Sequence, residues 1–244
     1  MRSRPVLPRA VAATCATALA ACTALGTTAA AGTGGGPGRT ADPVAEGVTP
    51  RSRSGVVPGI EILVRDSLHL LRGKRVGLIT NHTGRARDGT SAVDLLHRTP
   101  GVTLVALFGP EHGLRGAAQA GEKVAGGVDS ATGVVVHSLY GETRVPTPAM
   151  LRGIDVLVYD IQDVGARVYT YPWTMALAAE AAGKAGITFV VADRPDPIGG
   201  TQVEGGVLDT AFRSFVGQYP VAMRYGLTAG ELLRHLVRTG QVQA

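Results

Sequence analysis

The chain has 244 residues and a formal net charge of +5, and both of its cysteines, Cys15 and Cys22, lie near the N-terminus. Residues 1–58 hold 6 arginines and 2 acids, whereas residues 59–244 hold 18 basic and 17 acidic side chains. Residues 59–244 are nearly neutral and have no basic stripe, which argues against nucleic-acid binding. They also have no cysteine, which excludes disulfides, thiolate metal sites and a cysteine nucleophile within them.

Residues 1–31 are predicted to be an export signal. A basic start, MRSRPVLPR, precedes an apolar run of small residues that is too short to be a stable membrane span. Within this run, Leu19-Ala20-Ala21-Cys22 has the form of a bacterial lipobox, which predicts lipidation at Cys22 and an outward-facing anchor on the cell membrane. The alternative is cleavage after Thr28-Ala29-Ala30 and secretion. On either path we expect the protein to leave the cytoplasm.

Two further segments follow the export signal. Residues 32–58 are rich in Gly, Pro, Arg and Ser without an apolar period, which predicts a disordered linker. Residues 59–244 suffice for one domain with a real core.

Within residues 59–244, short runs of Val, Ile and Leu alternate with amphipathic or Ala-rich stretches, which predicts an α/β fold with an open, mostly parallel sheet and helices on both faces. The apolar runs are continuous, as expected for strands covered on both sides. The predicted strands are Arg75–Thr80, Thr103–Phe108, Gly133–His137, Val156–Ile161 and Thr188–Ala192. The predicted helices are Glu61–Arg72, Ser91–Arg98, Thr147–Leu151, Pro172–Ala185 and Thr228–Arg238, the last of which begins with a capping box formed by Thr228 and Glu231.

Polar residues concentrate where the predicted strands end. Because the carboxyl ends of parallel strands meet at one edge of a sheet, residues far apart in the chain are expected to line a single crevice there. These residues are Asn81 and His82 after the first strand, Glu111 and His112 after the second, Asp160, Gln162 and Asp163 after the fourth, and Asp193 and Arg194 after the fifth.

Glu111 lies on a turn shaped by glycine and proline, in the run Phe108–Gly113. Such a turn lets the backbone approach a ligand and a side chain project into the crevice, so Glu111 is a candidate general acid or base. The alternative is a turn carboxylate that caps a following helix. His112 is the weaker candidate, because a lone histidine beside a glutamate is often only an orienting partner.

The run Tyr159–Tyr171 combines two acids, an amide, Arg167 and several aromatic rings, including Tyr169. This mixture suits sugar recognition, because hydroxyl groups bind carboxylates and amides while a pyranose face stacks on a ring. The alternative for Asp163 and Arg167 is an ion pair that stiffens the loop.

The next loop, which begins at Asp193, carries two further acids. Asp193 either binds substrate or holds Arg194 and the loop N–H groups, and structural support is favoured for Asp196.

Hydrolysis of a glycosidic bond ordinarily uses two carboxyl groups, roughly 5 Å apart for retention and roughly 6.5–9.5 Å apart for inversion. We assign the acid to Glu111 and leave its partner open between Asp160 and Asp163. The chain has no G-x-S-x-G elbow, no P-loop and no G-x-G-x-x-G after the first strand. His82, His112 and His137 lack a close-spaced ligand pair, so zinc is a minor alternative and no metal or cofactor is predicted.

Six ordered motifs together resemble the exo-β-N-acetylmuramidase family of peptidoglycan hydrolases, formerly a domain of unknown function. The resemblance implies a Rossmann-like domain that forms a cleft with a smaller C-terminal domain, where terminal N-acetylmuramic acid is removed from the non-reducing ends of peptidoglycan fragments. The P-E-H-G motif carries the catalytic acid onto Glu111, and the D-I-Q-D-V-G-x-R motif carries cleft roles onto Asp160, Gln162, Asp163 and Arg167. The motifs are GLITNHTG (77–84), LFGPEHGLRG (107–116), SLYGETRVPTPAML (138–151), DVLVYDIQDVGARVYTY (155–171), VVADRPDPIGG (190–200) and SFVGQYPVAMRYGLTAGEL (214–232).

Two features depart from the family pattern. Asp196 stands where the family more often has Asn. Similar proteins continue past the last predicted helix, so we expect most of the smaller C-terminal domain to be absent from this chain, with weaker binding or activity as the consequence.

The leading hypothesis is therefore an exo-acting glycosidase at the cell surface. The alternatives are a non-catalytic lipoprotein that binds muropeptides and a metal-dependent hydrolase. The sequence predicts no oligomeric state.

Overall fold

The computed structural model describes residues 55–116, 118–119 and 121–244. The predicted export signal, the lipidation site Cys22 and residues 32–54 of the predicted linker lie outside the described residues, so these remain expectations. Within the described ranges, no helix combines the length and the apolar character needed to cross a bilayer.

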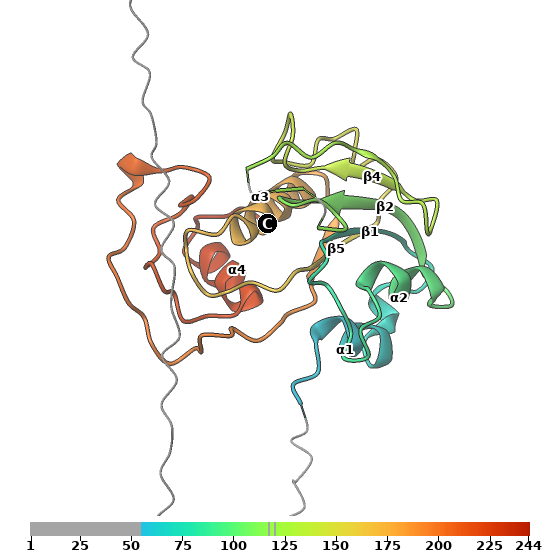
Figure 1. Ribbon diagram of the computed structural model, residues 1–244, viewed down its shortest axis with the longest axis horizontal. Helices are drawn as coiled ribbons and strands as arrows, with labels where there is room; N and C mark the ends of the chain where they lie inside the picture. Colours follow the sequence, from blue (N-terminus) through green and yellow to red (C-terminus); the bar gives the residue numbers. More distant parts are fainter. Residues whose placement is uncertain (1–54, 117, 120) are drawn as a thin grey trace, which may run out of the picture. The chain divides into compact units, whose positions relative to one another are not determined.

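The described chain forms a six-stranded sheet in the order β3-β4-β2-β1-β5-β6 (Figure 1). Every neighbouring pair is parallel except β3 with β4, which is antiparallel. The predicted α/β fold with a mostly parallel sheet is confirmed. The strands are β1 (Arg75–Thr80), β2 (Thr103–Gly109), β3 (Gly127–Val128), β4 (Val135–Ser138), β5 (Val156–Asp160) and β6 (Thr188–Val191).

The helices follow the predicted order with three exceptions, of which the first is the short η2 (Thr210–Phe212), a helix that was not predicted. Thr147–Leu151 forms only turns, which follows from a stretch too short to offset the cost of helix nucleation. The predicted helix Glu61–Arg72 divides into two, because the Ser67 N–H bonds to the carbonyl of Ile62, five residues back, and closes the first helix. The helices are α1 (Gly59–Arg65), η1 (Leu68–Leu70), α2 (Ala92–Arg98), α3 (Tyr171–Lys184), η2 (Thr210–Phe212) and α4 (Ala229–Arg238), whose predicted capping box is present.

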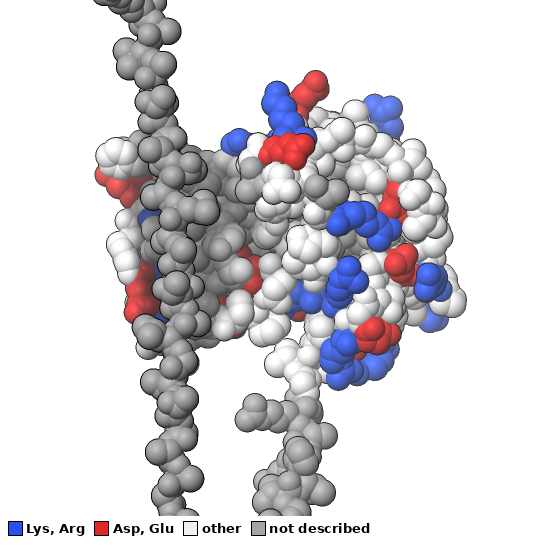
Figure 2. All heavy atoms as spheres, in the orientation of Figure 1, with Lys and Arg blue, Asp and Glu red and all other residues white. Residues whose placement is uncertain are grey.

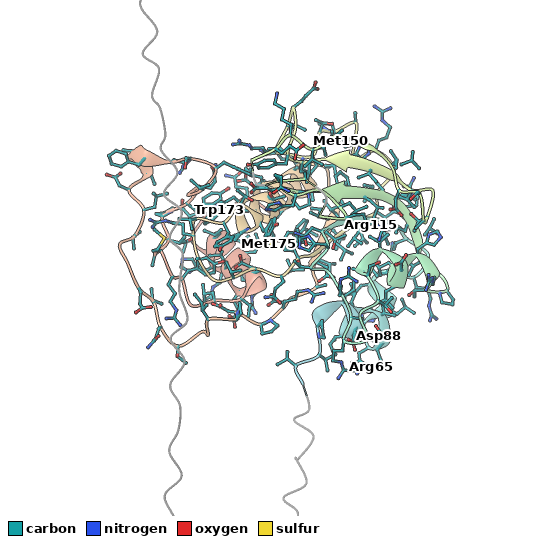
Figure 3. All side chains as sticks on the ribbon, viewed as in Figure 1. Arg65, Asp88, Arg115, Met150, Trp173 and Met175 are labelled. Carbon is teal, nitrogen blue, oxygen red and sulfur yellow. The ribbon has the colours of Figure 1, made fainter. Side chains whose placement is uncertain are left out.

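The sheet has a hydrophobic core on each face. In β1, Val76 and Leu78 pack in a cluster with residues of α1 and α2, whereas the neighbouring Ile79 packs in a second cluster with residues of α3 and α4. Figure 1 shows the two helix pairs on opposite sides of the sheet. Figure 3 labels Trp173 and Met175 of α3, which are fully buried in the second cluster. Burial on both faces explains why the strand sequences are continuous apolar runs.

The strand order fixes where a ligand site is expected. β1 lies in the centre, the chain passes to β2 and β4 on one side, and it then returns to β5 and β6 on the other. In open α/β sheets the crevice forms at the carboxyl ends of the strands where the order reverses, here beside β1 and β5. Asn81 directly follows β1, and Asp160 is the last residue of β5.

A long segment with little regular structure, residues 195–227, returns beside the loop that precedes α3. Arg224 forms bridges with Ala166 and with Glu204, and the N–H of Arg167 donates to the carbonyl of Met223 at 2.8 Å. This segment is the orange and red excursion in Figure 1. Figure 2 shows basic and acidic side chains interspersed over the visible face around α1 and α2, without a patch of a single sign.

Candidate functional site

Glu111 lies two residues beyond β2 and is tied to two other segments. Its Oε2 accepts a hydrogen bond from Oγ1 of Thr170 at 2.7 Å, and its Oε1 accepts one from the N–H of Gly121 at 2.9 Å. Thr170 immediately precedes α3, so the carboxylate joins the end of β2 to the connection that follows β5. No helix begins in the described residues directly after Glu111, which rules out the helix-cap alternative for this side chain.

The surroundings of Glu111 favour its ionised form. Burial acts to raise the pKa of this half-buried carboxyl, but hydrogen bonds from Thr170, Gly121 and Tyr140, together with the nearby His112, outweigh burial and lower the pKa. The substrate-free site therefore holds a carboxylate at neutral pH.

Two tyrosines complete this part of the site. Tyr140 lies two residues beyond β4, and burial together with the Glu111 charge raises the pKa of its phenol. Tyr171 is the first residue of α3, and burial followed by the Glu111 charge raises its pKa in the same way. The ends of β2 and β4 and the connection after β5 thus meet around one carboxylate.

Thr170, Tyr140 and Tyr171 were not predicted as site residues. The rule that identified Glu111 applies to them as well, because each lies in a segment that follows the carboxyl end of a parallel strand. Tyr140 follows the third predicted strand, two residues beyond the end of β4.

The histidines and Asn81 lie around the same edge. His112 has φ 67°, in the left-handed region that few non-glycine residues adopt, and its Nδ1 is 2.9 Å from the Ala118 carbonyl. The exposed His82 ring leaves no room for a side chain at Gly116, where a Cβ would lie 2.6 Å from its Nδ1. Asn81 is buried, and within the described residues its Nδ2 has no hydrogen-bond partner.

Asp160 is committed to a buried ion pair. Nε of Arg194 donates to Oδ1 at 2.6 Å, and Nη2 of the same guanidinium donates to Oδ2 at 3.0 Å. The Asp160 side chain is 0% exposed and that of Arg194 is 8% exposed. Burial raises the pKa of Asp160, and the guanidinium offsets part of that effect. In this structure both carboxylate oxygens are bound to protein rather than presented to a ligand.

Asp163 is also buried, with one oxygen bonded and the other without a partner. Its Oδ2 accepts hydrogen bonds from the Tyr225 hydroxyl and from the N–H of Gly165, whereas Oδ1 is unpaired among the described residues. Burial raises the pKa of Asp163, hydrogen bonds from Tyr225 and Gly165 act against this, and the Asp196 charge adds to it. The alternative of an Asp163–Arg167 ion pair is not found.

The remaining predicted residues hold loops in place. Gln162 Nε2 donates to the carbonyls of Asp163 and Pro195. Asp193 accepts from the Thr228 hydroxyl at 2.5 Å, and from the N–H groups of Gly230 and Arg194, both at 3.0 Å, so it fixes the start of α4.

Arg167 and Tyr169 differ in how they engage the protein. Nη1 of Arg167 donates to the carbonyls of Gly206 and Val221, at 2.8 and 2.6 Å, and so fastens the long segment to this loop. Tyr169 is 47% exposed, so part of this side chain is accessible to a ligand.

Glu111 follows β2 and Asp160 ends β5, two strands that are separated by β1 alone. With adjacent strands about 4.8 Å apart, the two backbones are about 10 Å apart at this edge. The two carboxylates therefore belong to the same edge of the sheet. The predicted pairing of Glu111 with Asp160 or Asp163 stays a prediction, and the contacts of both aspartates suit a positioning role.

Comparisons with known proteins identify the family and support the fold. Residues 76–244 match the family described as "Exo-beta-N-acetylmuramidase NamZ, N-terminal". Over 177 residues the chain is 53% identical to a protein of Bacillus subtilis (strain 168) named peptidoglycan beta-N-acetylmuramidase NamZ, a match that covers 72% of this chain and 43% of that protein.

Two crystal structures from Bacteroides fragilis NCTC 9343, both described as DUF1343 family proteins, share the fold. One has a TM-score of 0.71 and 50% identity, covering 76% of this chain and 47% of that one. The other has a TM-score of 0.65 and 33% identity, covering 75% and 47%. The chain spans less than half the length of the relatives that it matches.

Proposed function

The chain belongs to the NamZ exo-β-N-acetylmuramidase family through the family's N-terminal part, and we propose that it acts on peptidoglycan as a glycosidase. The proposed reaction removes β-linked N-acetylmuramic acid from the non-reducing ends of peptidoglycan fragments. Glu111 is the proposed general acid/base: as the acid it protonates the leaving oxygen while the bond from C1 to that oxygen breaks, and water adds to C1.

The observation that carries this proposal is the set of groups gathered on Glu111. Thr170, Tyr140 and the N–H of Gly121 reach this one carboxylate from three different segments. Such support fixes the position of a side chain, as a group that transfers a proton to a bound sugar requires. The name of the Bacillus subtilis relative, a peptidoglycan beta-N-acetylmuramidase, supports the same substrate class.

A general acid must be protonated when it acts, whereas the pKa of Glu111 is lowered in the substrate-free site. A bound sugar would cover this half-buried carboxyl and remove its remaining water. Further desolvation raises the pKa of a carboxyl. We therefore propose that substrate binding itself moves Glu111 toward its protonated form.

The test is hydrolysis of a chromogenic N-acetylmuramic acid β-glycoside by wild type and by Glu111→Gln. The amide can still accept the Thr170 hydrogen bond but can neither donate a proton to the leaving oxygen nor accept one from water, so kcat should fall by up to about 10²–10⁴-fold. The matched control is Glu122→Gln, which alters an exposed carboxylate of the same loop whose Oε2 accepts from the Gln119 N–H. The control should retain wild-type kcat.

The leaving group separates the role of acid from that of base. A nitrophenolate departs with little help from a proton, so Glu111→Gln should lose less activity on an activated glycoside than on a muropeptide. Equal rates for wild type and Glu111→Gln on both substrates would overturn the assignment.

Binding of muropeptides without turnover is the second candidate function. The lowered pKa of Glu111 favours it, because a stable carboxylate is suited to accept hydrogen bonds from sugar hydroxyls. Under this alternative, calorimetry detects binding of muropeptides while no aglycone is released.

We also propose that the protein is exported and anchored to the outer face of the cell membrane through a lipid on Cys22. The lipobox pattern supports this proposal. Growth of an expressing bacterium with labelled palmitate should label the wild-type protein and leave Cys22→Ala unlabelled. Label on both proteins, or on neither, would refute lipidation at this residue.

A further inference from the structure

Arg144 lies shortly after β4, on the same segment as Tyr140. Its guanidinium carbon is 4.2 Å from the centroid of the Phe215 ring and 5.7 Å from that of the Tyr140 ring. The two rings are 6.1 Å apart and inclined at 41°. A cation placed over two aromatic faces is restrained by them, although its side chain is exposed.

No carboxylate in the described part of the chain lies within ion-pair distance of Arg144. Some arginines that serve the fold have such a partner, as Arg194 has Asp160 and Arg115 has Asp129, and Arg167 donates to two backbone carbonyls instead. An arginine presents a planar fork of donors that matches a carboxylate. An exposed, restrained guanidinium without an acid is therefore suited to bind an anionic group of a ligand.

The position of Arg144 relative to Glu111 limits what that ligand can be. Tyr140 touches both residues, since its ring lies under the guanidinium and its phenol acts on the Glu111 carboxylate. The backbone just before Tyr140 is bonded to the backbone just before Glu111, because the Leu139 N–H donates to the Gly109 carbonyl at 2.8 Å. Arg144 and Glu111 thus lie on either side of one tyrosine, at the carboxyl ends of the paired strands β2 and β4.

One chemical feature of the substrate class proposed above suits two such neighbouring groups. N-acetylmuramic acid differs from N-acetylglucosamine only in the lactyl ether on O3, and this ether carries a carboxylate. On a pyranose ring that carboxylate lies about 5–6 Å from the glycosidic oxygen on C1, as ordinary bond lengths require. A sugar whose glycosidic oxygen meets Glu111 can thus direct its lactyl carboxylate at Arg144.

We propose that Arg144 binds the lactyl carboxylate of the terminal sugar and so selects N-acetylmuramic acid over N-acetylglucosamine. This inference rests on the proposed function, and it adds the residue that distinguishes N-acetylmuramic acid from N-acetylglucosamine. Phe215 enters the same site from the long segment after β6, so that segment helps to hold the specificity residue.

The test compares three nitrophenyl β-glycosides, those of N-acetylmuramic acid, of its lactyl carboxamide and of N-acetylglucosamine. Arg144→Gln should lower kcat/KM for the free acid by about 10- to 100-fold, mainly through KM, because a charge-assisted hydrogen bond is lost away from the reacting bond. The carboxamide and the N-acetylglucosamine glycoside should react equally with wild type and variant. The matched control is Arg213→Gln, which removes another exposed guanidinium, 5.9 Å from the Tyr219 ring centroid.

The other possible results either support or reject the role of Arg144. An unchanged kcat/KM for the free acid, or an equal loss on all three glycosides, would overturn it while leaving the proposed function in place. If wild type hydrolyses none of them, the proposed function has failed, and calorimetry with free N-acetylmuramic acid and N-acetylglucosamine decides the inference. Weaker binding of N-acetylmuramic acid alone by Arg144→Gln supports selection by Arg144, and equal binding by wild type and variant rejects it.

Discussion

The buried ion pair between Asp160 and Arg194 provides the sharpest test of how this site is supported. Asp160→Asn keeps the shape of the side chain but leaves the guanidinium charge without a counter-charge, at 8% exposure. Removing one partner of a buried pair costs about 3–5 kcal/mol, because the other charge stays desolvated. Asn can still accept one of the two hydrogen bonds, so we expect about 3 kcal/mol.

For a domain of this size, a loss of about 3 kcal/mol lowers Tm by about 6–12 °C. Urea denaturation should show a lower midpoint with an unchanged slope. The matched control is Asp66→Asn, which breaks the exposed pair with Arg65 and should leave the midpoint nearly unchanged. A loss below about 1 kcal/mol for Asp160→Asn would refute the argument from burial.

A double variant separates stability from chemistry. Adding Arg194→Met to Asp160→Asn removes the stranded cation, so the double variant should recover much of the lost stability. If Asp160 only positions the site, the refolded double variant should still hydrolyse the chromogenic glycoside. A double variant that folds but releases no aglycone, while wild type does, would place Asp160 in the chemistry as the partner of Glu111.

Three further predictions concern the site and its supports. Thr170→Val removes a hydrogen bond that lowers the Glu111 pKa, so the pH at which glycoside turnover falls on the alkaline side should move upward, whereas Thr170→Ser should keep the wild-type profile. Burial raises the pKa of Asp163 in the folded state, so the folded chain holds this proton more readily than the unfolded chain. The proton on Asp163 therefore stabilises the fold at pH values below the ordinary pKa of aspartate, and this stabilisation is lost as pH rises through the folded pKa. Between these two pKa values, the Tm of Asp163→Asn should fall less with rising pH than the Tm of wild type. Parallel curves of Tm against pH would contradict this prediction. Gly84→Ala would place a Cβ 2.1 Å from Oγ1 of Thr80 and 2.8 Å from the Asp160 carbonyl, so urea denaturation should show a loss of about 1–3 kcal/mol, while Gly127→Ala, which meets nothing within 4 Å, should show almost none.

The sheet could be predicted from the sequence because its strands are buried on both faces. β1 begins and ends where its apolar run does, and β2, β5 and β6 differ from the predicted ranges by a single residue at one end. The predicted strand Gly133–His137 is shifted by one to two residues in β4. The predicted range starts with a glycine and ends with a histidine, so the ends of its apolar run are poorly defined in the sequence. The apolar run of β5 has clear ends.

The sequence by itself also determined which edge of the sheet carries the polar residues. Parallel strands point the same way, so the residues that follow them gather at one edge whatever the details of packing. That rule predicts Glu111, Asn81 and Asp160 at one edge, and it holds equally for Tyr140, which follows β4.

Only the tertiary structure decided which of these side chains are bound to one another. Asp160 and Arg194 are 34 residues apart in the sequence and form a buried ion pair. Asp193 fixes the start of α4. Glu111 accepts a hydrogen bond from Thr170, which is 59 residues away in the sequence. A polar residue after a strand has the same local pattern whether its partner is protein or ligand. What it can do depends on the neighbours that folding brings to it, because hydrogen bonds form at about 3 Å and burial and nearby charges act over only slightly longer distances.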